Sequence, residues 1–165
     1  MRTPLDSTIP FTRVDQQYFK VLRISATIWL VVCIVPTLAL GYFFGMDGFP
    51  GVLWWLTPLI PLAIGIPALL FAKRRARAIG YFEDEDELII HSGVMFESLT
   101  VVPYGRMQQV NVSTGPLLRR FDLVRIELVT ASAASNASVP GLSRAEAERL
   151  RVKLTNLGNS QMEGL

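Results

Sequence analysis

The chain contains two uncharged stretches, ISATIWLVVCIVPTLALGYFF over Ile24–Phe44 and VLWWLTPLIPLAIGIPALLFA over Val52–Ala72, each of 21 residues. Because an α-helix rises about 1.5 Å per residue, each stretch would be about 31 Å long, close to the hydrocarbon thickness of a bilayer, about 30 Å. The intervening residues GMDGFPG include three glycines and a proline, which indicates a tight turn. We therefore expect two transmembrane helices in an antiparallel hairpin.

The composition favours a membrane protein with one small domain outside the bilayer. Of 165 residues, 50% are hydrophobic and 18% are charged, whereas soluble domains have about 25% charged residues. Asp47 is the only charged residue between Ile24 and Ala72. This distribution excludes an ordinary soluble domain and a disordered chain, and two apolar segments are too few to enclose a transport pathway. The first stretch is also longer than the apolar region of a cleaved signal peptide, about 7–15 residues.

Basic residues indicate the orientation of the hairpin. Four Lys or Arg residues precede the first stretch and four follow the second, whereas the loop between them has none. The positive-inside rule therefore predicts a multi-pass protein with both termini in the cytoplasm and Asp47 outside. The second stretch contains three prolines, Pro58, Pro61 and Pro67. They form a hinge or packing notch for a partner, or they are simply tolerated, as prolines in membrane helices often are.

Beyond residue 78 the sequence changes to short alternating segments bounded by turn residues, which is typical of antiparallel strands. The acidic run Glu83–Glu87 is expected to turn between the first two strands, and Ser92-Gly93 to form a two-residue turn into the third. The predicted strands are Ala78–Phe82, Glu87–His91, Val94–Val102, Arg106–Ser113, Leu123–Thr130 and a short one at Ala137–Pro140.

A helix with clear start and stop signals follows the strands. Ser143 and Glu146 form a capping box at its start, and Gly158 is the expected C-terminal cap. Four apolar residues form a stripe at helical spacing, namely Ala147, Leu150, Leu154 and Leu157. Short strands followed by one amphipathic helix predict an α+β domain: a bent antiparallel sheet or open barrel closed by the C-terminal helix.

The predicted organisation has five parts: a cytoplasmic N-terminal segment (1–23), the transmembrane hairpin (24–72), a basic juxtamembrane linker (73–78), the cytoplasmic domain (79–158) and a tail (159–165). A basic cluster marks the linker, formed by Lys73, Arg74, Arg75 and Arg77. Each base near an anionic leaflet contributes about 1 kcal/mol to membrane binding. The cluster is therefore a candidate lipid-binding surface, and it serves equally as a topology signal.

Three segments of the domain together resemble a known family: PYGRMQQV (Pro103–Val110), GPLLRRF (Gly115–Phe121) and PGLSRAEAE (Pro140–Glu148). With the two preceding spans they resemble the bacterial pleckstrin-homology (PH-like) family, in particular its YdbS-like membrane branch, over about residues 18–157. The resemblance implies a PH-like barrel with a C-terminal helix in a bacterial plasma membrane, and it implies no activity. Asp122 departs from the glycine usual in the family, and a left-handed backbone there would cost Asp little.

The connector Leu117-Leu118-Arg119-Arg120-Phe121 is the candidate docking segment of the domain. A basic pair bracketed by apolar residues fits an interface that docks a partner. The alternative is a structural connector whose Leu117 and Phe121 lie in the core.

The sequence lacks the residue patterns of catalysis and of metal, cofactor or nucleic-acid binding. Cys33 and His91 are each the single residue of their type, which excludes a disulfide framework and leaves zinc without enough ligands. No nucleophile elbow, phosphate loop or dinucleotide fingerprint occurs, and the mildly acidic domain has no basic footprint for nucleic acid. The carboxylates of Glu83–Glu87 would repel a phosphoinositide headgroup, and they form either a solvated turn or a site for a divalent cation. We therefore expect a non-enzyme without a cofactor or resident metal.

The sequence thus favours a non-catalytic module that docks or scaffolds a protein partner at the cytoplasmic face and contacts membrane lipid. Another PH-like membrane protein and a second copy of this chain are the candidate partners. The alternatives are a lipid- or ligand-binding module and an accessory subunit of a transport or envelope complex.

Overall fold

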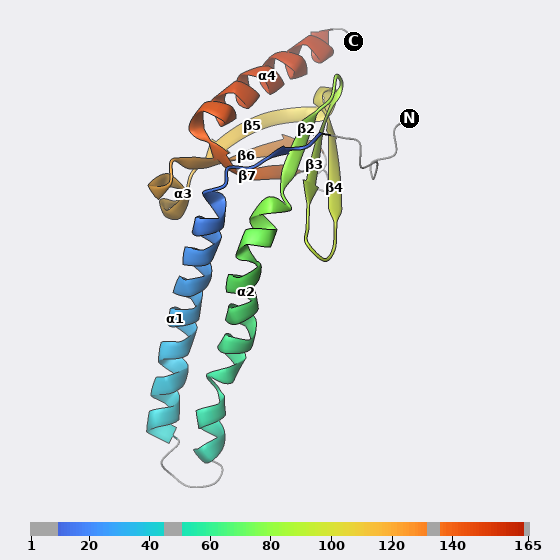
Figure 1. Cartoon of the computed structure of the whole chain (residues 1–165). Coiled ribbons are helices and arrows are strands. Elements are labelled where there is room, and N and C mark those ends of the chain that lie inside the picture. The colour runs from blue at the N-terminus through green and yellow to red at the C-terminus, as the bar shows by residue number, and fades with distance from the viewer. Residues whose placement is uncertain (1–9, 45–50, 132–135, 164–165) are drawn as a thin grey trace. The chain divides into compact units, whose positions relative to one another are not determined.

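The structure is a computed structural model that describes residues 10–44, 51–131 and 136–163, and the chain divides into two compact units. One unit, Phe19–Lys73, is helical. The other combines the N-terminal segment up to Tyr18 with the chain from Arg74 onward, and it contains the strands (Figure 1). The helical unit is therefore inserted in the chain between the first strand and the rest of the sheet unit. The turn expected around Asp47 lies outside the described residues.

The helical unit consists of helix α1 (Tyr18–Phe44), the 3-10 helix η1 (Gly51–Leu56) and most of helix α2 (Leu59–Arg77). Of the helices that the structure describes, α1 alone is long and apolar enough to cross a membrane. The second span expected over Val52–Ala72 is not shown as one helix. A turn at Thr57 and Pro58 separates η1 from α2, and α2 continues beyond Ala72 into the basic cluster. Proline lacks the amide that a continuous helix would need at this point.

The two helices of this unit pack closely at one glycine and expose apolar side chains elsewhere. A Cβ on Gly65 would lie 2.4 Å from Cγ of the buried Leu30, so only glycine allows this approach. Pro61 lines an apolar groove of about 370 Å³ together with Trp29 and Cys33. The large outward-facing side chains include Val31, Val32, Val35, Leu59, Ile60, Ile64 and Leu70. Such a surface is far more apolar than a water-exposed helix pair tolerates.

The other unit contains two antiparallel sheets (Figure 1). The first has the order β1-β2-β3-β4, with strands β1 (Thr12–Arg13), β2 (Gly80–Glu83), β3 (Glu87–Ser92) and β4 (Ser98–Pro103). The 3-10 turn η2 (Tyr104–Arg106) leads to the second sheet, of order β5-β6-β7. Its strands are β5 (Met107–Ser113), β6 (Leu123–Thr130) and β7 (Ala137–Ser143), with the short helix α3 (Pro116–Arg120) between β5 and β6.

Helix α4 (Arg144–Glu163) covers the three-stranded sheet (Figure 1). Its buried side chains are Ala147, Leu150 and Leu154, three of the four positions of the predicted stripe, while Leu157 is half-buried. On the sheet, the alternate residues Val124, Ile126 and Leu128 of β6 are buried, as the period of two requires. The start of the helix is confirmed, because the Glu146 amide donates to Oγ of Ser143 at 3.3 Å.

The α+β class is confirmed, but three details of the prediction are wrong. The described strands form two separate antiparallel sheets, in place of the one bent sheet or open barrel that we expected. The Asp15 amide, just after β1, donates to the Gly141 carbonyl of β7 at 2.9 Å and so connects the two sheets. The turn after β3 covers residues 93–97 and not two residues, because Gly93, with a φ of 126°, ends the pairing and β4 resumes only at Ser98. Helix α4 passes through Gly158, since glycine lowers helix stability by only about 1 kcal/mol and is tolerated.

We expect Leu150→Ala to lower the free energy of unfolding by about 2–5 kcal/mol, because this side chain is fully buried between α4 and the sheet. Val152→Ala, on the exposed side of the same helix, is the matched control and should change stability by less than about 1 kcal/mol. Urea unfolding of the full chain in mild detergent, followed by circular dichroism, measures both. Equal effects of the two substitutions would mean that α4 is not part of the core.

Candidate functional site

The basic cluster Lys73, Arg74, Arg75 and Arg77 forms the last turns of α2. All four side chains are exposed, and the helix ends at Arg77, where the next amide, that of Ala78, donates to the Arg74 carbonyl at 2.9 Å. Cations at a helix C-terminus are stabilised by the helix dipole. The cluster thus presents concentrated positive charge directly before the sheet begins at Gly80.

The predicted docking connector forms helix α3 and its C-terminal cap. Leu118 is its buried anchor, whereas Leu117 and Phe121 are half-buried and Arg119 and Arg120 are exposed. The alternative prediction, a connector with Leu117 and Phe121 in the core, is only partly right, because both side chains are half-buried. Within the described residues neither guanidinium forms an ion pair, unlike Arg144, Arg149 and Arg151. The surface of α3 thus combines two unpaired cations with accessible apolar area.

Asp122 follows this helix with a φ of 54°, the left-handed backbone that the usual glycine of the family would adopt. Its carboxylate lies 3.3 Å from Nε of Arg144 at the start of α4. Both side chains are largely exposed, so the pair contributes little to stability. The departure from glycine is accommodated without loss of the turn.

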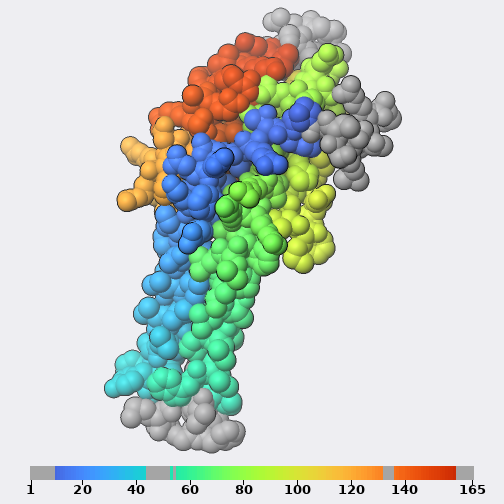
Figure 2. Space-filling model, in the orientation of Figure 1, coloured from blue at the N-terminus to red at the C-terminus, as the bar shows by residue number. Residues whose placement is uncertain are grey.

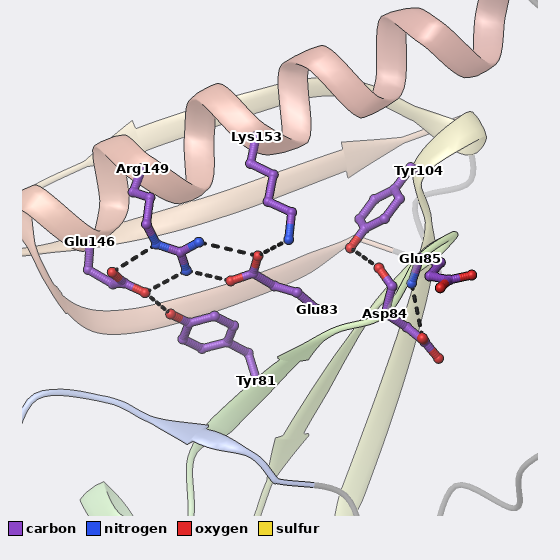
Figure 3. Close-up of polar contacts among 8 residues, drawn as sticks. All are labelled: Tyr81, Glu83, Asp84, Glu85, Tyr104, Glu146, Arg149 and Lys153. Carbon is purple, nitrogen blue, oxygen red and sulfur yellow. Dashed lines mark hydrogen bonds and ion pairs between the residues drawn. The ribbon is translucent and has the colours of Figure 1, made fainter.

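A network of charged residues connects β2 with α4 (Figure 3). Glu83 accepts from Arg149 and from Nζ of Lys153, the latter at 2.6 Å, and its side chain is only 12% exposed. Arg149 also contacts the Glu146 carboxylate at 2.7 Å, and the Tyr81 hydroxyl donates to that same carboxylate. The sequence suggested that Glu83 could be part of a solvated turn. The structure shows instead that Glu83 joins strand β2 to helix α4.

The network changes the pKa values of its members in ways that follow from these contacts. Burial raises the pKa of the Glu83 carboxyl, but the hydrogen bonds and charges of Arg149 and Lys153 outweigh it, so the pKa falls below its usual value. Hydrogen bonds from Arg149 and then Tyr81 lower the pKa of Glu146. Burial and the bond to Glu146 raise the pKa of the Tyr81 hydroxyl, which therefore stays protonated and donates.

The remainder of the acidic turn is organised by Tyr104 (Figure 3). The Tyr104 hydroxyl donates to the Asp84 carbonyl at 3.0 Å, and the Tyr104 amide donates to the Asp86 carbonyl at 3.0 Å. Burial, reinforced by the surrounding carboxylates, raises the pKa of Tyr104 to about 12. No group of three or more His, Cys, Asp or Glu side chains placed to hold a metal ion occurs among the described residues.

Comparison with known proteins identifies the family. The family model described as Bacterial PH domain matches residues 19–157. This chain belongs to the bacterial PH domain family. It is 32% identical, over 155 residues, to the UPF0699 transmembrane protein YdbS of Bacillus subtilis (strain 168), and the alignment covers 90% of this chain and 92% of that protein. No solved structure matches the chain.

The family assignment confirms the resemblance to the bacterial PH-like family and to its YdbS-like membrane branch. The relative is a transmembrane protein by name, and α1 supplies a helix of membrane-spanning length here. The candidate residues lie on different elements: the basic cluster is on α2 and the docking connector is on α3.

Acid should weaken the β2–α4 network, and Glu83→Gln tests this. The pKa values of Glu83 and Glu146 are lowered in the folded chain, so their stabilisation is fully present above about pH 4.5 and is lost as pH falls through the lowered values. The temperature at which half of the protein is unfolded should therefore decrease when the pH is lowered below about 4.5. At pH 7, Glu83→Gln should lower the free energy of unfolding by about 1–3 kcal/mol and should flatten this acid dependence.

Glu148→Gln is the control, because Glu148 pairs with Arg151 on the exposed face of the same helix. It should leave the unfolding midpoint at pH 7 nearly unchanged. A loss for Glu83→Gln no larger than that of the control would contradict a structural role for the network.

Proposed function

We propose that this protein is a non-catalytic PH-like module that is anchored in a bacterial plasma membrane and docks a protein partner at the cytoplasmic face. The observation that carries the proposal is the surface of α3, where Arg119 and Arg120 are exposed and make no ion pair with a described residue. Leu118 is the buried residue that attaches this helix to the domain, whereas the side chains of the two arginines make no contact that the described fold needs. Unpaired arginines beside apolar area are typical of protein interfaces.

We further propose that the chain crosses the membrane twice. The apolar part of α2, Leu59–Ala72, is about 21 Å long, and the 3-10 helix η1 adds about 12 Å. Placed end to end, they are long enough to span the hydrocarbon core, about 30 Å. The outward-facing Leu59, Ile60 and Leu70 support contact with lipid, because water would not solvate them favourably.

Orientation follows from the same basic residues that flank the hairpin. With both termini in the cytoplasm, the cluster Lys73, Arg74, Arg75 and Arg77 lies at the inner leaflet, where it binds anionic headgroups at about 1 kcal/mol per base. This contact with lipid is unspecific. A lipid-binding module is the second candidate function, and the cluster is the observation that favours it.

Reporter fusions test the orientation. A reporter that is active only in the cytoplasm should be active when fused after Leu165 and inactive when fused at Asp47. A single crossing would instead place these two positions on the same side, and activity at both positions or at neither would contradict the two-span proposal. Replacement of the four bases of the cluster by Gln should reduce the difference in reporter activity between the two positions without changing the expression level of the protein.

The charge of α3 indicates the chemistry of the partner. Two adjacent cations fit an acidic protein surface, and electrostatic complementarity selects partners more strongly than it adds affinity. The candidate partners are another PH-like membrane protein with an acidic surface and a second copy of this chain. In a second copy the exposed Glu85 and Asp86 of the acidic turn would supply the opposite charge.

The double variant Arg119→Ala/Arg120→Ala tests docking. It should abolish co-purification of the partner from mild detergent, or dissociate the homo-oligomer in sizing experiments. The free energy of unfolding should stay within about 0.5 kcal/mol of that of the original chain. The matched control is Arg144→Ala/Arg151→Ala, which removes two exposed arginines that already pair with Asp122 and Glu148. Unfolding by the α3 variant, or equal loss of the partner with both variants, would contradict docking through α3.

A further inference from the structure

The loop between β3 and β4, Gly93–Glu97, exposes the most accessible large apolar side chains among the described residues of the PH-like domain. Met95 is 85% exposed, Phe96 is 88% exposed and Val94 is 39% exposed. Phenylalanine and methionine are normally buried, and three consecutive apolar residues at a loop tip are unusual where polar residues would form the same turn. We call Gly93–Glu97 the apolar loop; its part of the chain lies at the surface in Figure 2 (yellow-green).

Strand register places the apolar loop at a particular end of the first sheet. Gly80, the first residue of β2, pairs with His91, and Ser92 pairs with Ser98 across the loop. The apolar loop is therefore at the end of the sheet where β2 begins. The opposite end of the same sheet is the acidic turn, where β2 passes into β3.

The chain enters and leaves the sheet at the same end as the apolar loop. Gly80 is the third residue after Arg77, so the two lie within about 11 Å of each other. Strand β1 is antiparallel to β2, and Arg13, its last residue, pairs with Gly80. The chain thus continues from this end of the sheet toward α1 as well. Both connections to the apolar helices, the basic cluster and the apolar loop converge on one end of one sheet.

We propose that the apolar loop inserts Met95 and Phe96 into the headgroup region of the cytoplasmic leaflet. This inference rests on the proposed membrane placement of the chain, which brings the bases next to Gly80 to the membrane surface. Side chains of this type bury favourably at the boundary between headgroups and acyl chains. The loop adds a second contact to the bilayer at the end of the sheet that the chain itself tethers there.

The charge around the loop fits shallow insertion and not headgroup recognition. Glu97 is the only charged residue of the apolar loop, and its carboxylate lies 3.9 Å from Nε2 of His91. The loop carries no base to attract a phosphate, so its contact with lipid depends on apolar area alone. Two or three apolar side chains bind a membrane weakly, but tethering raises the effective concentration of the loop at the surface, and weak insertion suffices.

An environment-sensitive fluorophore on the full chain tests the proposal. In a Cys33→Ser background, Met95→Cys is labelled and the chain is placed, one copy per disc, in nanodiscs of phosphatidylethanolamine and phosphatidylglycerol that contain spin-labelled lipid. We expect emission at shorter wavelength and loss of fluorescence to the lipid quencher. Glu85→Cys, at the acidic turn of the same sheet, is the matched control and should show neither effect. Phe96→Ser, added to Met95→Cys, should reduce the quenching.

The native Cys33 separates failure of this inference from failure of the proposed function. Labelled in the unmodified chain, it reports whether α1 is in the bilayer. Quenching at Cys33 without quenching at residue 95 would overturn insertion of the loop and leave the membrane placement standing. Absence of quenching at Cys33 would overturn both. A label at residue 95 that is shielded from a water-soluble quencher but not quenched by lipid would mean that protein covers the loop, which also overturns the proposal.

Discussion

The pairing of two residues of β1 with β2 is the constraint on which the rest of the arrangement depends. Thr12 pairs with Tyr81 and Arg13 with Gly80, across a separation of more than sixty residues of sequence that contains both apolar helices. Closing so long a loop costs entropy that two residue pairs do not offset alone. The buried Val14 and the bond from the Asp15 amide to the Gly141 carbonyl add to the pairing. The N-terminal segment is thereby part of the PH-like domain.

The distribution of ion pairs decides which charges remain for binding. Helix α4 is rich in bases, but Arg149 and Lys153 bind Glu83, and Arg151 binds Glu148. The helix that covers the sheet therefore offers little free positive charge to a phosphate group. The cations of α3, which pair with no carboxylate among the described residues, lie on another helix, and this favours a protein partner over a headgroup pocket built from α4. The same ion pairs give Glu83, the first carboxylate of the acidic run, a structural role.

Sequence patterns predicted the features that depend on local chemistry. The capping box and the apolar stripe of α4 are contained in one short segment of sequence. The alternation of buried and exposed residues in β6 is likewise contained in one segment. The role of Glu83 was missed because its partners lie 66 and 70 residues away in the sequence. Strand β1 was missed because two residues carry no periodic signal. Val94, Met95 and Phe96 were assigned to a strand because hydrophobicity alone does not distinguish a buried strand from an exposed loop.

With the apolar helices in the bilayer, as proposed, the chain itself holds the PH-like domain at the membrane, and this changes what the domain needs to do. A soluble domain must reach the bilayer through the affinity of a headgroup pocket, whereas a tethered domain is already present at high effective concentration. Selection for a basic pocket is then unnecessary, and the acidic run Glu83–Glu87 is tolerated at the end of the sheet away from the helix connections. The near end instead combines bases and apolar side chains. The two ends of one sheet thus differ in chemistry in the way that a fixed orientation toward a membrane would require.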